Sequence, residues 1–131
     1  MTQPAHGQLV LIVEDNDKNR KLFSEVLRYH GFRTLEASTS HEGIALALSQ
    51  QPSLVLMDIQ LPDTDGVESL HRLRAQPNAF DGVVVALTAY AMKEDAERFL
   101  SAGFDGYISK PIDILEFPKT VDGFCRLRPP A

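Results

Sequence analysis

"LVLMDIQLPDTDG", residues Leu54 to Gly66, decides the fold class and raises a question about function. Four consecutive apolar residues lead directly into Asp58, and Pro62 and Gly66 then mark a loop. A short continuous apolar run bounded by turn residues is typical of a strand buried on both faces of a parallel sheet. A turn residue would have been enough to stop such a strand, so the carboxylate at its end needs a separate explanation.

Similar apolar runs alternate with helical patterns along the whole chain. Strands are predicted at Leu9 to Val13, Phe32 to Ala37, Leu54 to Met57, Val83 to Leu87 and Gly106 to Ser109, and the two more mixed runs, the second and the fifth, are predicted to be edge strands. Helices are predicted around Leu22 to Leu27 with Gly31 as a cap, from Ser40, around Val67 to Leu73, around Ala96 to Leu100 before Gly103, and around Ile114 to Phe124 despite Pro118 and Gly123. Five βα units with short connections predict a doubly wound α/β domain with helices on both faces.

The composition limits the class of protein. With 131 residues, of which 44% are hydrophobic and 24% charged, the chain has the size and balance of one soluble globular domain. We expect loose tails at residues 1–7 and 128–131 around a domain at 8–127. No apolar run approaches the roughly 18 residues that span a bilayer, and the single Cys125 suits a reducing cytoplasm.

The charges of the chain do not indicate a nucleic-acid surface. The formal net charge is −5, and the basic residues are scattered instead of clustered. Proteins that bind DNA directly usually concentrate lysine and arginine on one face. We therefore expect neither direct DNA binding nor membrane insertion.

Polar residues follow the predicted strands at the points where the strands end. Glu14 and Asp15 follow the first strand, Asp58 the third, Thr88 the fourth and Lys110 the fifth. In a doubly wound fold, the carboxyl ends of all strands lie along one edge, where ligands bind. The topology therefore brings three carboxylates, one hydroxyl and one ammonium to one place.

Each of these residues has an ordinary alternative explanation. Asp15, with the two residues after it, could cap a helix that begins at about Lys18. Asp58 could be a loop residue, Thr88 a second cap and Lys110 a solvated charge. The coincidence of all of them is harder to explain in this way, because clustered carboxylates repel one another unless a cation lies among them.

The donor types of the cluster select the cation and suggest a reaction. All candidate ligands are oxygens, which favours a hard ion, Mg²⁺ above all, beside a phosphate. A cation, a hydroxyl and an ammonium around a carboxylate are typical of sites for phosphoryl transfer. In such sites most of the catalysis comes from positioning the reactants and neutralising charge on the phosphoryl oxygens. A carboxylate can itself be the nucleophile, and Asp58 is the candidate phosphoacceptor.

The motifs resemble those of a known family. Glu14 and Asp15, "MDIQLPDTDG", "ALTAYAMKED" and "GYISKP" are similar to the CheY-like receiver domains of two-component response regulators, over residues 8 to 126. Within that family, the pattern is most similar to single-domain regulators of the DivK type and to receivers attached to hybrid kinases. The resemblance implies a flavodoxin-like (βα)5 fold with strand order 2-1-3-4-5, and a signalling switch instead of an enzyme.

The resemblance also implies roles for the acidic residues. Asp58 would accept a phosphoryl group from a phosphohistidine on a sensor histidine kinase or a histidine phosphotransfer protein. Asp15 and Asp58 would bind Mg²⁺ directly, together with the backbone carbonyl of Gln60. Glu14 would bind it through water. Family members more often carry two aspartates at the first site, and a water-mediated contact should accommodate the longer side chain of Glu14.

A second group of residues would transmit the phosphorylation. Thr88 and Lys110 would each bind a phosphoryl oxygen, and Pro111 would follow a cis peptide bond. Tyr107 matches an aromatic residue that rotates on activation, although an aromatic on an edge strand can also simply cover the core. The output would be protein contact with a downstream effector through the face formed by the fourth helix, fifth strand and fifth helix, by a monomer or a phosphorylation-linked homodimer.

Two further positions would set the lifetime of the phosphoryl group. Gln60 and Tyr90 occupy places where family members tune dephosphorylation, and the Tyr90 ring could shield the acyl phosphate from water. We expect a Tyr90→Ala change to speed dephosphorylation, unless Tyr90 merely lies on the loop surface.

Several alternative functions share parts of this pattern. A haloacid dehalogenase phosphatase needs a second aspartate two residues after its nucleophile, where this chain has Gln60. A flavodoxin needs a phosphate loop rich in hydroxyl and glycine donors, where this chain has the acidic "EDNDKNR". A receiver cut from a hybrid kinase or a larger regulator, and a receiver-like module that never becomes phosphorylated, remain alternatives.

Overall fold

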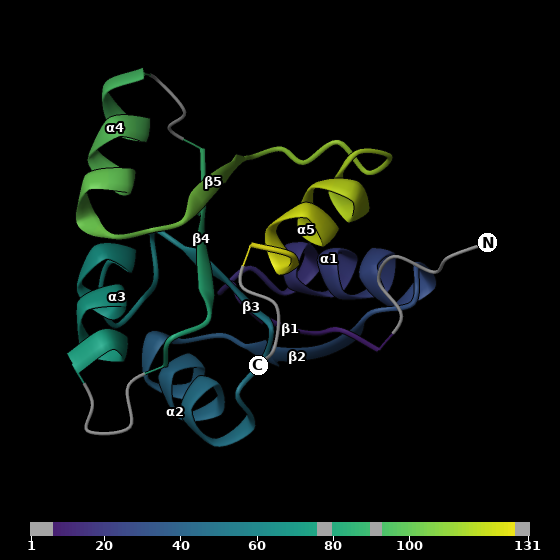
Figure 1. Cartoon of the computed structure of the whole chain (residues 1–131), viewed down its shortest axis with the longest axis horizontal. Helices are drawn as coiled ribbons and strands as arrows, with labels where there is room; N and C mark the ends of the chain where they lie inside the picture. The colour runs from purple at the N-terminus through teal and green to yellow at the C-terminus, as the bar shows by residue number, and fades with distance from the viewer. Residues whose placement is uncertain (1–6, 76–79, 90–92, 128–131) are drawn as a thin grey trace.

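The computed structural model of the chain describes residues 7–75, 80–89 and 93–127 (Figure 1). The parallel sheet has the order β2-β1-β3-β4-β5, with strands β1 (Leu9–Val13), β2 (Arg33–Ala37), β3 (Leu54–Asp58), β4 (Val83–Thr88) and β5 (Gly106–Ser109). The helices are α1 (Asp17–Tyr29), α2 (Ser40–Gln50), α3 (Gly66–Ala75), α4 (Lys93–Ala102) and α5 (Phe117–Cys125). The predicted doubly wound α/β fold of order 2-1-3-4-5 is confirmed. Across the described ranges, no helix has both the length and the apolar character needed to span a membrane.

Helices cover both faces of the sheet (Figure 1). The buried residues between the helices and the sheet form two apolar layers. On one face, α1 and α5 pack through Phe23, Leu27, Phe117 and Val121 against alternate strand residues such as Val10 and Ile12. On the other face, α2, α3 and α4 pack through Ala47, Leu70, Leu73 and Phe99 against the intervening residues such as Leu11 and Val13. Strands buried on both sides explain why the apolar runs in the sequence are continuous instead of alternating.

The strands end close to the predicted positions, with two informative differences. β3 extends to Asp58, which lies opposite Leu87 in the ladder, and β4 extends to Thr88, which lies opposite Ser109. β2 and β5 are the edge strands, as predicted. The two polar residues are therefore part of the sheet itself, and the ladder fixes their backbone positions.

The residues that cap α1 and α4 can be identified in the structure. The side chain of Asn16 accepts a hydrogen bond from Asn19 N at 2.9 Å, so α1 begins at Asp17, about where it was predicted. The N-cap is therefore Asn16 and not Asp15. Gly31 and Gly103, with φ of 95° and 115°, end α1 and α4 in the left-handed conformation that favours glycine.

The prediction that the last helix includes Ile114 was wrong. The Asp113 carboxylate accepts hydrogen bonds from the backbone N–H groups of Leu115 at 3.0 Å and Glu116 at 3.3 Å, and this local turn replaces the first helical turn. The helix begins at Phe117, so Pro118 falls in the first turn, where its missing N–H leaves no gap in the hydrogen bonding.

Candidate functional site

The carboxyl edge of the sheet carries a polar pocket. Its volume is about 330 Å³, and it is lined by Glu14, Asp15, Asn16, Asn19, Asp58, Ile59, Gln60, Thr88, Ala89 and Lys110. Residues from the ends of four strands meet there, as the topology predicted. Every carboxylate, hydroxyl and ammonium proposed from the sequence for the reaction lines this pocket.

Three carboxylates lie close together in the pocket. Oxygens of Glu14, Asp15 and Asp58 all lie within 4.8 Å of one another. Glu14 is 1% exposed and Asp58 is 4% exposed, whereas Asp15 faces solvent. The three carboxylates offer oxygen ligands in a polar pocket. They therefore fit a hard divalent cation that keeps part of its water shell.

Lys110 lies against this cluster and offsets part of its negative charge. Its Nζ is 2.7 Å from Glu14 Oε1 and 3.1 Å from Asp58 Oδ2. Burial opposes the charge on Lys110, but the hydrogen bonds to the two carboxylates outweigh burial and raise the pKa of the ammonium. The lysine therefore stays protonated within the pocket.

Glu14 is the carboxylate whose environment is most altered. Burial raises the pKa of the Glu14 carboxyl, and the adjacent carboxyl of Asp58 raises it further, while Lys110 and the Asn16 N–H act in the opposite direction. The Asn16 N–H donates to Glu14 Oε2 at 3.1 Å, so both oxygens of this carboxylate are engaged. A buried carboxylate held in this way is stable only beside a positive charge.

Asp58 is held in a fixed orientation at the end of β3. The Gln60 N–H donates to Asp58 Oδ1 at 3.0 Å, while the other oxygen, Oδ2, contacts Lys110. Its backbone belongs to the central part of the sheet. The side chain therefore lines the pocket from the end of a strand in the middle of the sheet.

Thr88 and Pro111 lie next to this arrangement. Thr88 is 1% exposed, and its backbone carbonyl accepts a hydrogen bond from Lys110 N at 2.7 Å, so the ends of β4 and β5 are joined. The Lys110–Pro111 peptide bond is cis.

The structure does not bring Tyr107 into the pocket. This half-buried residue of β5 packs against the apolar layer under α2, α3 and α4. Tyr90, proposed from the sequence to tune the lifetime of the phosphoryl group, lies outside the described residues.

Some contacts of the site had no signal in the sequence. The Arg20 guanidinium donates to the backbone carbonyl of Glu14 at 2.9 Å and also pairs with Glu36 on β2 at 3.4 Å. This side chain therefore fixes the segment that carries Glu14 and Asp15. A side chain that reaches a carbonyl six residues back follows no periodic pattern, so sequence reasoning missed it.

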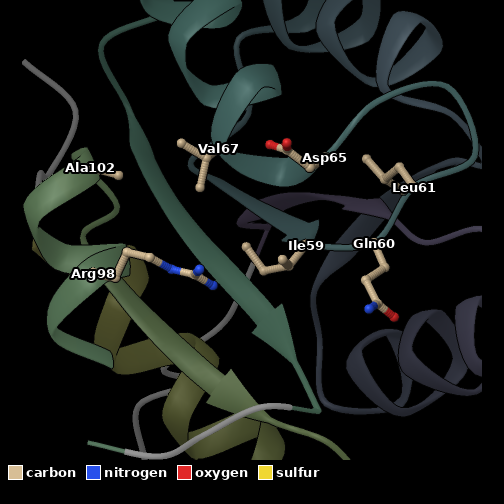
Figure 2. A pocket seen from close by; sticks show the side chains of 7 residues that line it. All are labelled: Ile59, Gln60, Leu61, Asp65, Val67, Arg98 and Ala102. Carbon is tan, nitrogen blue, oxygen red and sulfur yellow. The ribbon is translucent and has the colours of Figure 1, made fainter. Parts of the chain in front are cut away.

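A second, larger pocket lies between α4 and the loop that joins β3 to α3 (Figure 2). Its volume is about 710 Å³, and it is lined by Ile59, Gln60, Leu61, Asp65, Val67, Arg98 and Ala102. Ile59 and Gln60, the two residues that follow Asp58, therefore line both pockets.

Comparison with known proteins assigns the family. The profile of the response regulator receiver domain matches residues 10–122. The chain belongs to this family. The receiver is 40% identical over 115 residues to the polar-differentiation response regulator DivK of Brucella ovis, an alignment that covers 88% of this chain and 94% of DivK. The predicted resemblance to receivers and to DivK is confirmed, and the phosphatase and flavodoxin alternatives are set aside.

Solved receiver structures agree with this assignment. The receiver domain of the sensor histidine kinase PA1611 from Pseudomonas aeruginosa PAO1 is 33% identical, with a TM-score of 0.81 over 91% of this chain and 98% of that one. It was solved with a magnesium ion coordinated in its active site cleft. A CheY-like receiver domain protein from Methanospirillum hungatei JF-1 is 30% identical, with a TM-score of 0.78 over 91% of this chain and 94% of the other.

Proposed function

We propose that this receiver accepts a phosphoryl group on Asp58 from a phosphohistidine of a sensor histidine kinase or a histidine phosphotransfer protein. The observation that carries the proposal is the placement of Asp58. This residue is buried at the end of β3, contacts Lys110, and lines a pocket with two further carboxylates. No other carboxylate among those lining this pocket ends a strand of the sheet.

The transfer forms one bond and breaks another. An oxygen of the Asp58 carboxylate attacks the phosphorus, the phosphorus–nitrogen bond breaks, and its electron pair returns to the imidazole of the donor. Glu14, Asp15, Asp58 and the backbone carbonyl of Gln60 would hold Mg²⁺, with Glu14 acting through water. When bound, Mg²⁺ would neutralise charge on the phosphoryl oxygens as they approach the acidic pocket.

Lys110 and Thr88 connect the new phosphoryl group to the rest of the domain. The Lys110 ammonium exchanges its contact with Asp58 for one with a phosphoryl oxygen, and the Thr88 hydroxyl donates to another. Inverting a two-state equilibrium requires roughly 5 kcal/mol of differential stabilisation. Two charge-assisted hydrogen bonds of about 1.5–3 kcal/mol each provide a free energy of that order.

The output follows from where these two residues lie. They end β4 and follow β5, so their movement displaces the α4–β5–α5 face, with Tyr107 on β5 as part of the switch. A downstream protein effector then reads this face, with the receiver as a monomer or a phosphorylation-linked homodimer. Gln60 and Tyr90 set the lifetime of the phosphoryl group.

In this role the receiver is a signalling switch that catalyses only its own phosphorylation and dephosphorylation. The receiver occupies residues 8–127. The buried thiol of Cys125 suits a cytoplasmic setting, and the net charge of −5 does not favour direct contact with DNA. The alternative that this chain is the receiver of a hybrid kinase or of a larger regulator uses the same chemistry at Asp58.

The test is the intact mass of the protein after incubation with acetyl phosphate, with and without Mg²⁺. We expect the wild type to gain one phosphoryl group only with Mg²⁺, and Asp58→Asn to gain none. Asp113→Asn, which changes an exposed turn aspartate away from the pocket, is the matched control and should behave as wild type. No gain from acetyl phosphate or a phosphohistidine donor would favour a receiver-like module that binds partners without phosphorylation.

A further inference from the structure

Asp63 joins the loop after the phosphoacceptor to a different helix. Its Oδ1 accepts a hydrogen bond from the Ser40 N–H at 2.9 Å, and its Oδ2 accepts one from the His41 N–H at 3.0 Å. These two N–H groups are at the start of α2, 23 and 22 residues away in the sequence. The exposed Asp63 carboxylate therefore accepts hydrogen bonds from two of the free N–H groups at the N-terminus of α2. Asp63 belongs to the loop after β3, and not to the segment that leads into α2.

A buried contact lies beside this link. The hydroxyls of Ser40 and Ser69 are 2.6 Å apart, and both residues are fully buried between α2 and α3. The Ser69 hydroxyl also donates to the backbone carbonyl of Asp65 at 2.9 Å. The start of α2 thus contacts both the loop, through Asp63, and the helix that follows it, through Ser69.

The loop held in this way is the one that carries Gln60. Gln60 forms an isolated antiparallel bridge with Asp65, and the Gly66 N–H donates to the carbonyl of Ile59 at 2.8 Å. The loop is therefore closed at its base, and Asp63 lies near its tip. The two hydrogen bonds that Asp63 accepts connect this tip to α2.

The start of α2 is in turn fixed to the strand ends that carry the other acidic residues. A Cβ at Gly43 would lie 2.7 Å from Val13 Cγ2, so α2 packs directly on the end of β1. The Glu14 N–H donates to the carbonyl of Ala37, at the end of β2, at 3.0 Å. The start of α2 therefore forms a rigid link between the segment of Glu14 and the loop of Gln60.

We infer that Asp63 is a positioning residue for the cation site: by tying its loop to α2, it holds the Gln60 carbonyl in register with Glu14 and Asp15. The inference rests on the proposed function, because it assumes that the Gln60 carbonyl binds Mg²⁺. Backbone hydrogen bonds from Ser40 and His41 outweigh burial and lower the pKa of Asp63, so the link is intact at neutral pH. Outer contacts that orient metal ligands commonly affect affinity by about 10- to 100-fold.

The test compares Asp63→Ala with Thr39→Ala. Thr39 Oγ1 accepts from the Glu42 N–H at 3.2 Å, so it caps the same end of α2 through a hydrogen bond that lies within the helix and not between the helix and the loop. Both variants lose a cap and should lower the urea midpoint by comparable amounts. Only Asp63→Ala should weaken Mg²⁺ binding, by about 10-fold, the low end for such contacts.

The binding assay is a Mg²⁺ titration followed by amide NMR at 0.5 M KCl. At this salt concentration the Debye length is about 4 Å, so the lost charge of Asp63 contributes little at a distance. Asp63→Asn keeps an acceptor oxygen without the charge and should restore at least half of the lost affinity. In wild type, the Ser40 and His41 N–H resonances should shift with Mg²⁺, and in Asp63→Ala they should not.

Equal Mg²⁺ affinities for Asp63→Ala and Thr39→Ala would overturn the inference and reduce Asp63 to a helix cap. The proposed function would stand in that case, provided that the wild type still binds Mg²⁺ and takes up one phosphoryl group. If the wild type itself neither binds Mg²⁺ nor becomes phosphorylated, the proposed function and this inference both fail.

Discussion

Replacing Gly66 by alanine should destabilise the receiver, although helix propensity predicts the opposite. Gly66 is the first residue of α3, and a Cβ there would lie 2.9 Å from Asp58 O, Ile59 Cα and Ile59 Cδ1. Two of these three atoms belong to the backbone at the end of β3, next to the proposed phosphoacceptor Asp58, so no rotamer change can move them away.

The magnitude follows from these distances. Ordinary contact begins at 3.4 Å, so α3 and the end of β3 must separate by about 0.5 Å. Forcing an extra carbon into a packed position costs about 1–3 kcal/mol. The lower chain entropy and better helix propensity of alanine return at most about 1 kcal/mol. We expect a net loss of about 1–2 kcal/mol in the free energy of unfolding.

The assay is urea unfolding of Gly66→Ala beside Gly123→Ala. Gly123 lies on the exposed side of α5, and a Cβ added there would meet no atom within 4 Å, so alanine at this position should stabilise the protein by up to about 1 kcal/mol. Gly66→Ala should also slow phosphorylation, because Ile59 lies between Asp58 and Gln60. The reasoning is refuted if both variants gain stability and both are phosphorylated at the wild-type rate.

Three further outcomes are expected. In the absence of divalent cations, Lys110→Met should lower the free energy of unfolding in urea by about 2–3 kcal/mol, because two buried carboxylates lose their ammonium partner. The 19% exposure of the Lys110 side chain limits the effect. A loss no larger than in the exposed control Lys119→Met would contradict this prediction. Thr88→Ala should still be phosphorylated, but phosphorylation should change the NMR resonances of α4, β5 and α5 only slightly. Thr88→Ser keeps the hydroxyl and should respond as the wild type does. A full response in Thr88→Ala would exclude the proposed coupling. Burial, with a nearby carboxylate, raises the pKa of the Cys125 thiol to about 12. A disulfide reagent at pH 8 should therefore label this thiol only after the protein unfolds. Rapid labelling of the native protein would show instead that the thiol is accessible.

The order of elements and the location of the site were predictable because they depend on periodic patterns. Continuous apolar runs identify strands buried on both faces, and the βα alternation fixes a parallel sheet. Once the sheet is parallel, the residues that follow its strands must share one edge. This is why the pattern of the sequence was enough to predict that Asp58, Thr88 and Lys110, far apart in the chain, would meet.

The helix boundary that was predicted wrongly shows where pattern reasoning stops. Ile114 continues the apolar periodicity of α5, so the pattern includes it. The Asp113 side chain instead takes the N–H groups of Leu115 and Glu116 and forms a turn. Local competition between a side chain and the helix for the same donors leaves no periodic trace.

The sequence alone determined the fold class, the edge of the sheet that carries the polar pocket and the acidic residues gathered there. Only the tertiary structure decided that Lys110 pairs with Glu14 across 96 positions, that Glu14 is fully buried, and that Asp63 ties its loop to α2. The physical reason is that periodicity records which side chains avoid water, and that information is local. The choice of partner for a polar atom depends on loop paths and rotamers, which are set only when distant segments pack together.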